Sequence, residues 1–232
     1  MTTLFHDITR LLERTYANAG VALEDCIIHE ERCTQLSRLA GAQARELSHL
    51  ARTFLRHSGD NLFIGIYYSR WLISHLEAHD PRCGLSEKNI GSLIAFVEEI
   101  DHALHAALAF RRGVRDITSE PFIRNLELQS RVDTYMVLLL FVGFFRQTQR
   151  VSLTDRRWLR FHLFQREAND YTDEQIRGRY METGALGNLY TRLLDTLNAA
   201  RRVEEIRVFH ALDYDGKKER ILQLTAPRPQ SD

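Results

Sequence analysis

The feature that most constrains the fold is an apolar stretch inside a long helical pattern in the middle of the chain. Thr118 and Ser119, followed by Pro121, predict the start of a helix that continues to about Arg150. Within it, residues 137–145 are apolar on nearly every side, so other elements must bury this part all round. Such a run is far short of the ~20 residues of a membrane span. We therefore expect this helix to be the central core element of a helical bundle.

Helical periodicity also dominates the rest of the chain, and one short segment departs from it. A turn cluster at 58–61 leads into residues 62–68, which are rich in β-branched and aromatic side chains. We predict a mainly α fold, a multi-helix bundle with at most one short strand element at about 61–68. Residues 1–226 are expected to form a single domain, followed by a disordered tail at 227–232. The other predicted helices are one broken near Gly20, those at about 29–56, 70–79 and 86–112, one capped by Thr154, and those at about 172–184, 188–201 and 213–224.

Charge and cysteine content exclude several functional classes. The 31 basic residues balance the 31 acidic ones, so no long-range field attracts nucleic acid or anionic lipid. The cysteines, Cys26, Cys33 and Cys83, lack CxxC spacing, which argues against a disulfide framework and suits a reducing cytoplasm. The N-terminus has no signal-peptide pattern. We expect a cytoplasmic protein that binds neither nucleic acid nor membranes, with a second copy of itself or another protein as the partner.

One stripe of ionisable residues marks the helix predicted at 86–112. Glu98, Asp101, His102 and His105 have i, i+3, i+4 and i+7 spacing, so at about 100° per residue they share one side of that helix. The stripe borders the apolar face. Carboxylates and imidazoles beside a core are costly unless they pair with one another or bind a metal ion. The stripe is therefore the candidate functional site.

A divalent metal is one group that this stripe is suited to hold. Imidazole and carboxylate groups one helical turn apart can bind the same ion from one side. Further ligands must come from another helix. The helical period places Asp133 on the apolar face of the helix at 118–150, with Gln129 beside it. Glu127 is a further candidate, although it falls on the side of two arginines, which favours solvent.

The segment 98–102, Glu-Glu-Ile-Asp-His, resembles the zinc helix of HExxH metallopeptidases with the first histidine replaced by Glu98. The resemblance implies that Glu98 and His102 bind zinc and that Glu99 is the general base. It also implies a third ligand further along the chain, for which the candidates are Glu127 and Asp133. Because Glu98 stands in place of an imidazole, we expect no peptidase activity.

Glu99 and His102 also have the Glu-x-x-His spacing of ferritin-like di-iron bundles, in which such pairs project from the inner helices. This resemblance implies iron rather than zinc. That architecture repeats the pair on a second helix of the bundle.

Two functions from different classes follow from these observations. The first is a helical protein of unknown substrate whose buried carboxylate–histidine site binds zinc or iron. Its candidate residues are Glu98, Glu99, His102 and Asp133, with His105 and Glu127 as further ligands. The alternative is a non-catalytic protein–protein interaction module, in which the stripe is a structural salt-bridge network. In both cases we expect Glu98 or Asp101 to reach a polar group on the helix that carries Asp133.

Overall fold

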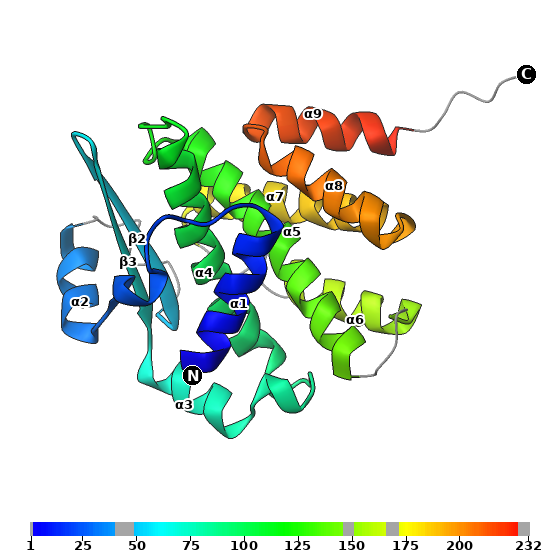
Figure 1. Cartoon of the computed structure of the whole chain (residues 1–232), viewed down its shortest axis with the longest axis horizontal. Helices are drawn as coiled ribbons and strands as arrows, with labels where there is room; N and C mark the ends of the chain where they lie inside the picture. The colour runs from blue at the N-terminus through cyan, green and yellow to red at the C-terminus, as the bar shows by residue number, and fades with distance from the viewer. Residues whose placement is uncertain (1, 40–48, 146–150, 166–171, 227–232) are drawn as a thin grey trace, which may run out of the picture.

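The computed structural model describes residues 2–39, 49–145, 151–165 and 172–226 (Figure 1). Over these residues it confirms a mainly α fold with a small sheet. Among the described helices, none has the length and apolar composition needed to span a bilayer. The elements are α1 (Thr2–Thr15), the 3-10 helix η1 (Leu23–Cys26), β1 (Ile27–Ile28), α2 (Glu30–Leu39), β2 (Ala51–Ser58), β3 (Asn61–Tyr68), α3 (Arg70–Ala78), the 3-10 helix η3 (Pro81–Cys83), α4 (Ile90–Arg111), α5 (Glu120–Phe145), α6 (Leu153–Phe164), α7 (Glu174–Thr196), α8 (Ala199–His210) and α9 (Tyr214–Thr225).

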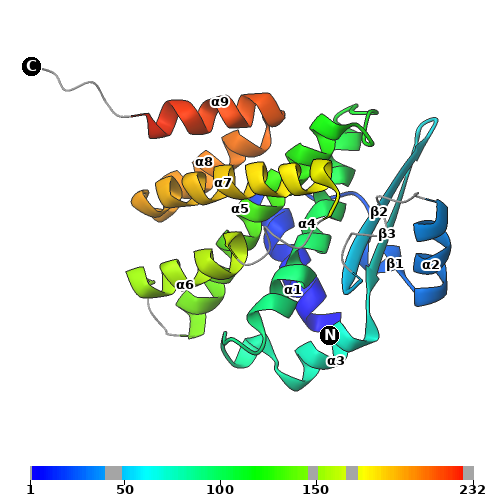
Figure 2. The same ribbon diagram turned by 180° about the vertical axis from the view of Figure 1, so that it is seen from behind.

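The sheet lies at one side of the molecule, between α2 and α4 (Figures 1 and 2). Its strand order is β1-β3-β2, with β2 antiparallel and β1 parallel to β3. Gly59 has a φ of +57° in the turn between β2 and β3, a conformation that glycine adopts without steric cost. Thr53 of β2 donates a hydrogen bond of 3.0 Å to the carbonyl oxygen of Glu99. The sheet therefore packs directly on the helix that carries the ionisable stripe.

The helix predicted at 29–56 is wrong over its C-terminal part. Helix α2 ends at Leu39, residues 40–48 lie outside the described residues, and residues 51–58 form β2. The apolar spacing of this segment fits a helix. Pairing of β2 with β3 along its whole length satisfies the backbone groups that face β3, so a contact with another strand overrides the local helical pattern. The strand expected at 61–68 is confirmed as β3.

Helices α4 and α5 form the centre of the molecule and pack against each other (Figure 1). His102 of α4 lies beside Glu127 of α5. Glu98, one turn earlier on α4, lies beside Arg131, one turn later on α5, so the two helices run antiparallel. Helix α1 packs on α4 and shares a core cluster with both helices. The central position expected for the long apolar helix is confirmed over α5, whereas residues 146–150 lie outside the described residues.

Helices α7, α8 and α9 cover α5 and enclose a second cluster of buried side chains. The helix end predicted near Gly184 is wrong, because α7 runs without interruption to Thr196. Gly187 in the same helix marks a close approach. A Cβ atom there would lie 2.9 Å from Cε1 of Phe164 and 3.3 Å from Cβ of Arg131. Both glycines therefore lie inside α7, and the single helix predicted at 188–201 is instead divided between the end of α7 and the start of α8.

Several helix starts differ from the predicted ones by up to three residues. The start predicted for the last helix is confirmed, because Asp213 accepts a hydrogen bond from the backbone N–H of Gly216 at 2.9 Å. The tail at 227–232 lies outside the described residues. The residues that precede α4, α6 and α7 are Asn89, Ser152 and Asp173, where the sequence predicts Ser86, Thr154 and Thr172.

Candidate functional site

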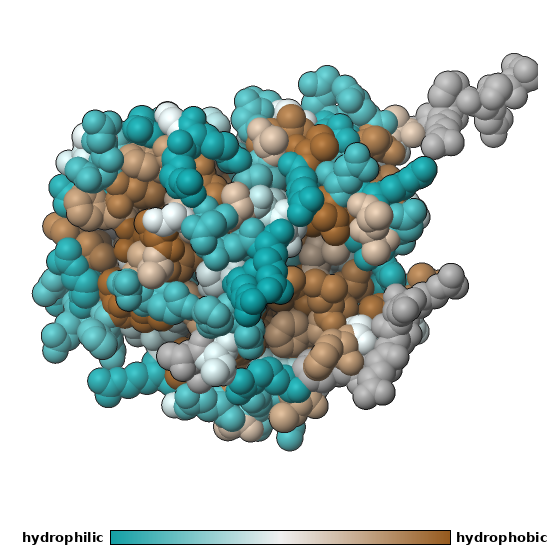
Figure 3. Space-filling view, viewed as in Figure 1, coloured by the Kyte–Doolittle hydropathy of each residue, from teal (hydrophilic) through white to brown (hydrophobic). Residues whose placement is uncertain are grey.

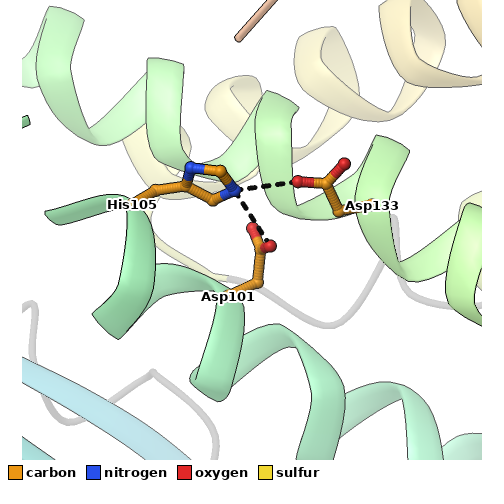
Figure 4. A group of neighbouring side chains, drawn as sticks. All are labelled: Asp101, His105 and Asp133. Carbon is orange, nitrogen blue, oxygen red and sulfur yellow. Dashed lines mark hydrogen bonds and ion pairs between the residues drawn. The ribbon is translucent and has the colours of Figure 1, made fainter. Parts of the chain in front are cut away.

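Three side chains with metal-ligating atoms meet in the interior, between α4 and α5 (Figure 4). Asp101 and His105 project from successive turns of α4, and Asp133 projects from α5. Nε2 of His105 lies 2.8 Å from Oδ2 of Asp133 and 3.1 Å from Oδ1 of Asp101. The exposed fractions are 0% for Asp101, 3% for His105 and 2% for Asp133. One ligand atom from each residue lies within 4.8 Å of the others, so this part of the interior has the spacing of a metal site.

Asp133 is held by hydrogen bonds from three side chains. The hydroxyl of Tyr16, just after α1, donates to Oδ1. Nε2 of Gln129 donates to Oδ2 at 2.9 Å and to the Tyr16 oxygen at 3.0 Å. His105 completes the set. Burial raises the pKa of Asp133, but the donors His105, Tyr16 and Gln129 outweigh burial and hold it below its usual value, so this carboxyl group is ionised.

Asp101 has a different environment. Both of its oxygens are shielded from water, and neither accepts a well-formed hydrogen bond from any described residue. Its contact with Nε2 of His105 is an ion pair at 3.1 Å, while the N–H of His105 is aligned with Asp133. Burial raises the pKa of Asp101 to about 6, against the attraction of His105. A buried carboxyl group without donors is stable only when it is protonated or paired with a cation.

His105 links the two carboxylates. Burial lowers its pKa, but the negative charges of Asp101 and Asp133 outweigh burial and raise it to about 9. The imidazole of the metal-free protein is therefore protonated at neutral pH. A metal ion held at Nε2 would take the place of that proton, so metal binding here would release it.

Aromatic rings from distant parts of the chain pack against His105. The ring of Tyr16 lies 4.9 Å from that of His105 and 4.5 Å from that of His210, at the end of α8. The rings of His105 and His210 are 4.6 Å apart. Burial, together with the positive charges of His105 and Arg112, lowers the pKa of His210 to about 2, so its imidazole is neutral.

A buried lysine of α9, Lys217, lies near His210 and the two carboxylates. Lys217 is 1% exposed, and its Nζ lies 5.1 Å from the ring centre of Phe209. Burial lowers the pKa of Lys217 to about 7, although the charges of Asp133 and Asp101 oppose this change. The lysine is therefore only partly charged at neutral pH and does not fully balance two carboxylates.

A second cluster surrounds His102, one turn earlier on α4. Oε2 of Glu99 lies 3.6 Å from Nδ1 of His102, and Oε2 of Glu127 lies 3.8 Å from Nε2. Burial lowers the pKa of His102, but Glu127, Glu99 and Glu98 outweigh burial and raise it to about 10. The carboxylates face opposite ring nitrogens. In this geometry an imidazolium ion bridges both, whereas a metal ion at either nitrogen contacts only one of them.

The residues predicted from the sequence thus fall into two groups. His105 and Asp133 meet, together with Asp101, while His102 meets Glu99 and Glu127. Asp133 therefore does not join the group of His102 in which the sequence placed it. The metal roles of the group around His102, and the role of Glu99 as a base, stay predictions.

Two further expectations concern single residues. The solvated position expected for Glu127 is wrong, because its side chain is 12% exposed and accepts a hydrogen bond of 3.2 Å from Tyr180. The contact expected between the stripe and the helix of Asp133 is confirmed, because Oε1 of Glu98 lies 3.3 Å from Nη1 of Arg131.

Sequence reasoning missed three residues that enclose the site. Tyr16, His210 and Lys217 lie near the two ends of the chain, and tertiary packing brings them to the middle of α4 and α5 (Figure 1). No spacing pattern relates them to the stripe. The weak available signal was that Lys217 is one of three lysines in a chain rich in arginine.

Comparison with protein-family models finds none that matches this chain, and none of the curated proteins or solved structures matches it either. The geometry and charge of the site are therefore the features that indicate its function.

Proposed function

We propose that the protein binds one divalent metal ion at Asp101, His105 and Asp133. The observation that carries the proposal is the environment of Asp101. Two oxygens of a fully buried carboxyl group accept no well-formed hydrogen bond from the described residues, and they lie beside a second carboxylate. A cation that contacts both carboxylates removes the cost of burying them.

The charges support a divalent ion. Asp101 and Asp133 together contribute two negative charges when ionised, and a neutral His105 contributes none. One divalent ion then balances the site, whereas the imidazolium form of His105 balances only half of it. Lys217 supplies at most part of the remainder, because burial lowers its pKa to about 7.

The donor set narrows the choice of metal. Two carboxylate oxygens and one imidazole nitrogen suit zinc or iron(II), whereas magnesium and calcium prefer oxygen ligands alone. Tyr16 and Gln129 orient Asp133 from behind, as outer partners of metal ligands commonly do. The proposal is one of metal binding and assigns no reaction, since Glu99, the predicted base, lies in the neighbouring cluster around His102.

One observation favours the alternative, a structural ionic network inside an interaction module. Nε2 of His105 lies within ion-pair distance of both carboxylates, so an imidazolium ion links them without a metal. Metal binding separates the two functions, because the network requires none.

A competition titration tests the proposal. Metal-free protein is titrated with zinc or iron(II) in the presence of a chromophoric chelator, which reports free metal. We expect Asp101→Asn, which preserves shape and removes the charge, to weaken binding by more than the roughly 10- to 100-fold that loss of an outer partner costs. Asp7→Asn makes the same change at an exposed residue of α1 and should leave binding unchanged. Equal affinities for wild type and Asp101→Asn would refute the proposal.

A further inference from the structure

A cavity of about 330 Å³ lies apart from the metal site. Its walls come from α1, η1, β1, the end of β3, α4 and the first turns of α2 and α3. On this side of the molecule, in the region of the sheet and α2, apolar surface is visible between hydrophilic patches (Figure 3). The volume falls within the range of small-molecule sites, which are concave and mostly apolar.

The most buried aromatic residues that line the cavity are Phe5 and Phe96. Phe5 packs edge-on against Tyr68 and Phe96, with ring centres 6.4 Å and 6.1 Å away. The hydroxyl of Tyr68 donates to the carbonyl oxygen of Phe96 at 3.0 Å, so its polar atom is already satisfied. This part of the wall therefore offers a ligand aromatic and aliphatic surface with no polar group of its own.

Tyr67 supplies a polar group to the same cavity. It is 9% exposed and lines the cavity, and its hydroxyl makes no hydrogen bond with any described residue. Burial raises the pKa of Tyr67, Glu30 adds to the rise, and Arg70 opposes it, so both charges lie near the phenol. The hydroxyl is thus available for a hydrogen bond in a cavity that is also lined by one acidic and one basic residue, Glu30 and Arg70.

Glu30 and Arg70 flank the cavity as the first residues of α2 and α3. They do not pair with each other, and in the described part of the chain neither side chain has an ion pair or hydrogen bond. Glu24, a third charged residue that lines the cavity, has a partner, because its Oε1 lies 3.4 Å from Nδ1 of His6. One apolar cavity is therefore bordered by a solvent-exposed carboxylate, a solvent-exposed guanidinium group and a phenol, none of which has a side-chain partner among the described residues.

We infer that this cavity binds an apolar or aromatic α-amino acid as the free zwitterion. The carboxylate of the ligand accepts from Arg70 and Tyr67, because guanidinium and hydroxyl donors suit it. The ammonium group lies at Glu30. The side chain of the ligand lies in the cavity against Phe5 and Phe96, which line it.

The charges of Glu30 and Arg70 favour a zwitterion over ligands that carry one charge or none. A carboxylic acid without the amine leaves Glu30 unmatched, and an amine without the carboxylate leaves Arg70 and Tyr67 unmatched. An uncharged apolar compound uses none of the three. Each missing charged hydrogen bond should therefore weaken binding, and the order of affinities identifies the ligand class.

Isothermal titration calorimetry of the full chain tests this inference with defined probes: phenylalanine, leucine, phenethylamine and 3-phenylpropionate. We expect saturable binding of phenylalanine or leucine. If phenylalanine binds, its affinity should be at least about tenfold higher than that of phenethylamine or 3-phenylpropionate, the analogues that carry only one charge. Arg70→Gln and Glu30→Gln should each reduce amino-acid binding by about tenfold or more. Arg38→Gln and Glu31→Gln, exposed residues of α2 outside the cavity, are the matched controls and should bind as wild type does.

Three results would overturn the inference. The first is no saturable binding of any of the four probes by folded protein. The second is equal affinity for the amino acid and a singly charged analogue. The third is amino-acid binding that survives both Arg70→Gln and Glu30→Gln. Because none of these residues belongs to the site of Asp101, the result is independent of metal binding.

Discussion

Nε2 of His105 on α4 lies 2.8 Å from Oδ2 of Asp133 on α5, and the two residues are 3% and 2% exposed. This contact links the two central helices through buried ionisable side chains. Exposed ion pairs contribute little to stability, because water already solvates both partners. A fully buried pair is different, since removal of one partner leaves the other without compensation. The His105–Asp133 contact should therefore contribute strongly to stability, and it belongs to the site at which we propose metal binding.

Asp133→Ala should strongly destabilise the metal-free protein. The substitution removes the acceptor of Tyr16, Gln129 and His105 at once. We expect the free energy of unfolding to fall by about 3–5 kcal/mol, the range for breaking a buried pair. Urea unfolding measures it, with Asp7→Ala at an exposed position as the control, for which a change within about 0.5 kcal/mol is expected. Similar small losses in both variants would show that Asp133 is not the centre of the network.

Tyr16→Phe removes the hydroxyl of Tyr16 and keeps its ring, so it measures the contribution of the hydroxyl alone. The variant keeps the packing against His105 and His210 and loses only the hydrogen bonds to Asp133 and from Gln129. We expect a loss of about 1–3 kcal/mol, because Asp133 then lacks one donor in a buried place. Thermal unfolding of metal-free protein checks it, and an unchanged melting temperature would contradict the hydrogen bond.

Two glycines of α7 make a matched pair for testing the helix packing. Gly187→Ala places a methyl group against Phe164 and Arg131 and should cost about 1–3 kcal/mol. Gly184→Ala meets no atom within 4 Å and should stabilise α7 by about 0.5–1 kcal/mol, since alanine favours a helix. Denaturant unfolding of both variants gives the comparison. Stabilisation by both substitutions would refute the close approach at Gly187.

His102 should make the stability of the metal-free protein depend on pH. Burial lowers its pKa, but Glu127, Glu99 and Glu98 outweigh burial and raise it from 6.5 to about 10. A pKa raised by folding gives stability that is fully present below the unfolded pKa and is lost as pH rises through the folded pKa. The stability difference between wild type and His102→Gln should therefore be largest below pH 6.5 and shrink up to about pH 10. Unfolding curves across this range measure it, and a difference that does not vary with pH would contradict the ionic cluster.

Much of the helical core follows from local pattern. The apolar residues of α5 and the stripe on α4 repeat with the helical period, so their helices and buried faces are predictable from spacing alone. Strand β2 is not, because its residues become a strand only through pairing with β3. The glycines of α7 predict a helix end that the structure does not have, for a similar reason. Gly187 lies in the helix interior because Phe164 packs closely against it, which no local rule reveals.

The candidate site likewise has some residues that the sequence predicts and others that only the tertiary structure reveals. Its α4 residues share a stripe that the sequence displays, and the apolar face of α5 nominates Asp133. The pairing of Asp133 with His105 rather than His102 depends on how the two helices cross, which spacing does not determine. Tyr16, which follows α1, and Lys217 of α9 reach the site through tertiary packing alone.

Metal content tests the central claim most directly. Wild type and Asp101→Asn are incubated with excess zinc or iron(II), passed through gel filtration, and analysed by inductively coupled plasma mass spectrometry. We predict about one metal ion per chain in wild type and little or none in the variant. Folded wild-type protein that retains no more metal than Asp101→Asn would contradict metal binding and leave His105 as the imidazolium link of a structural network.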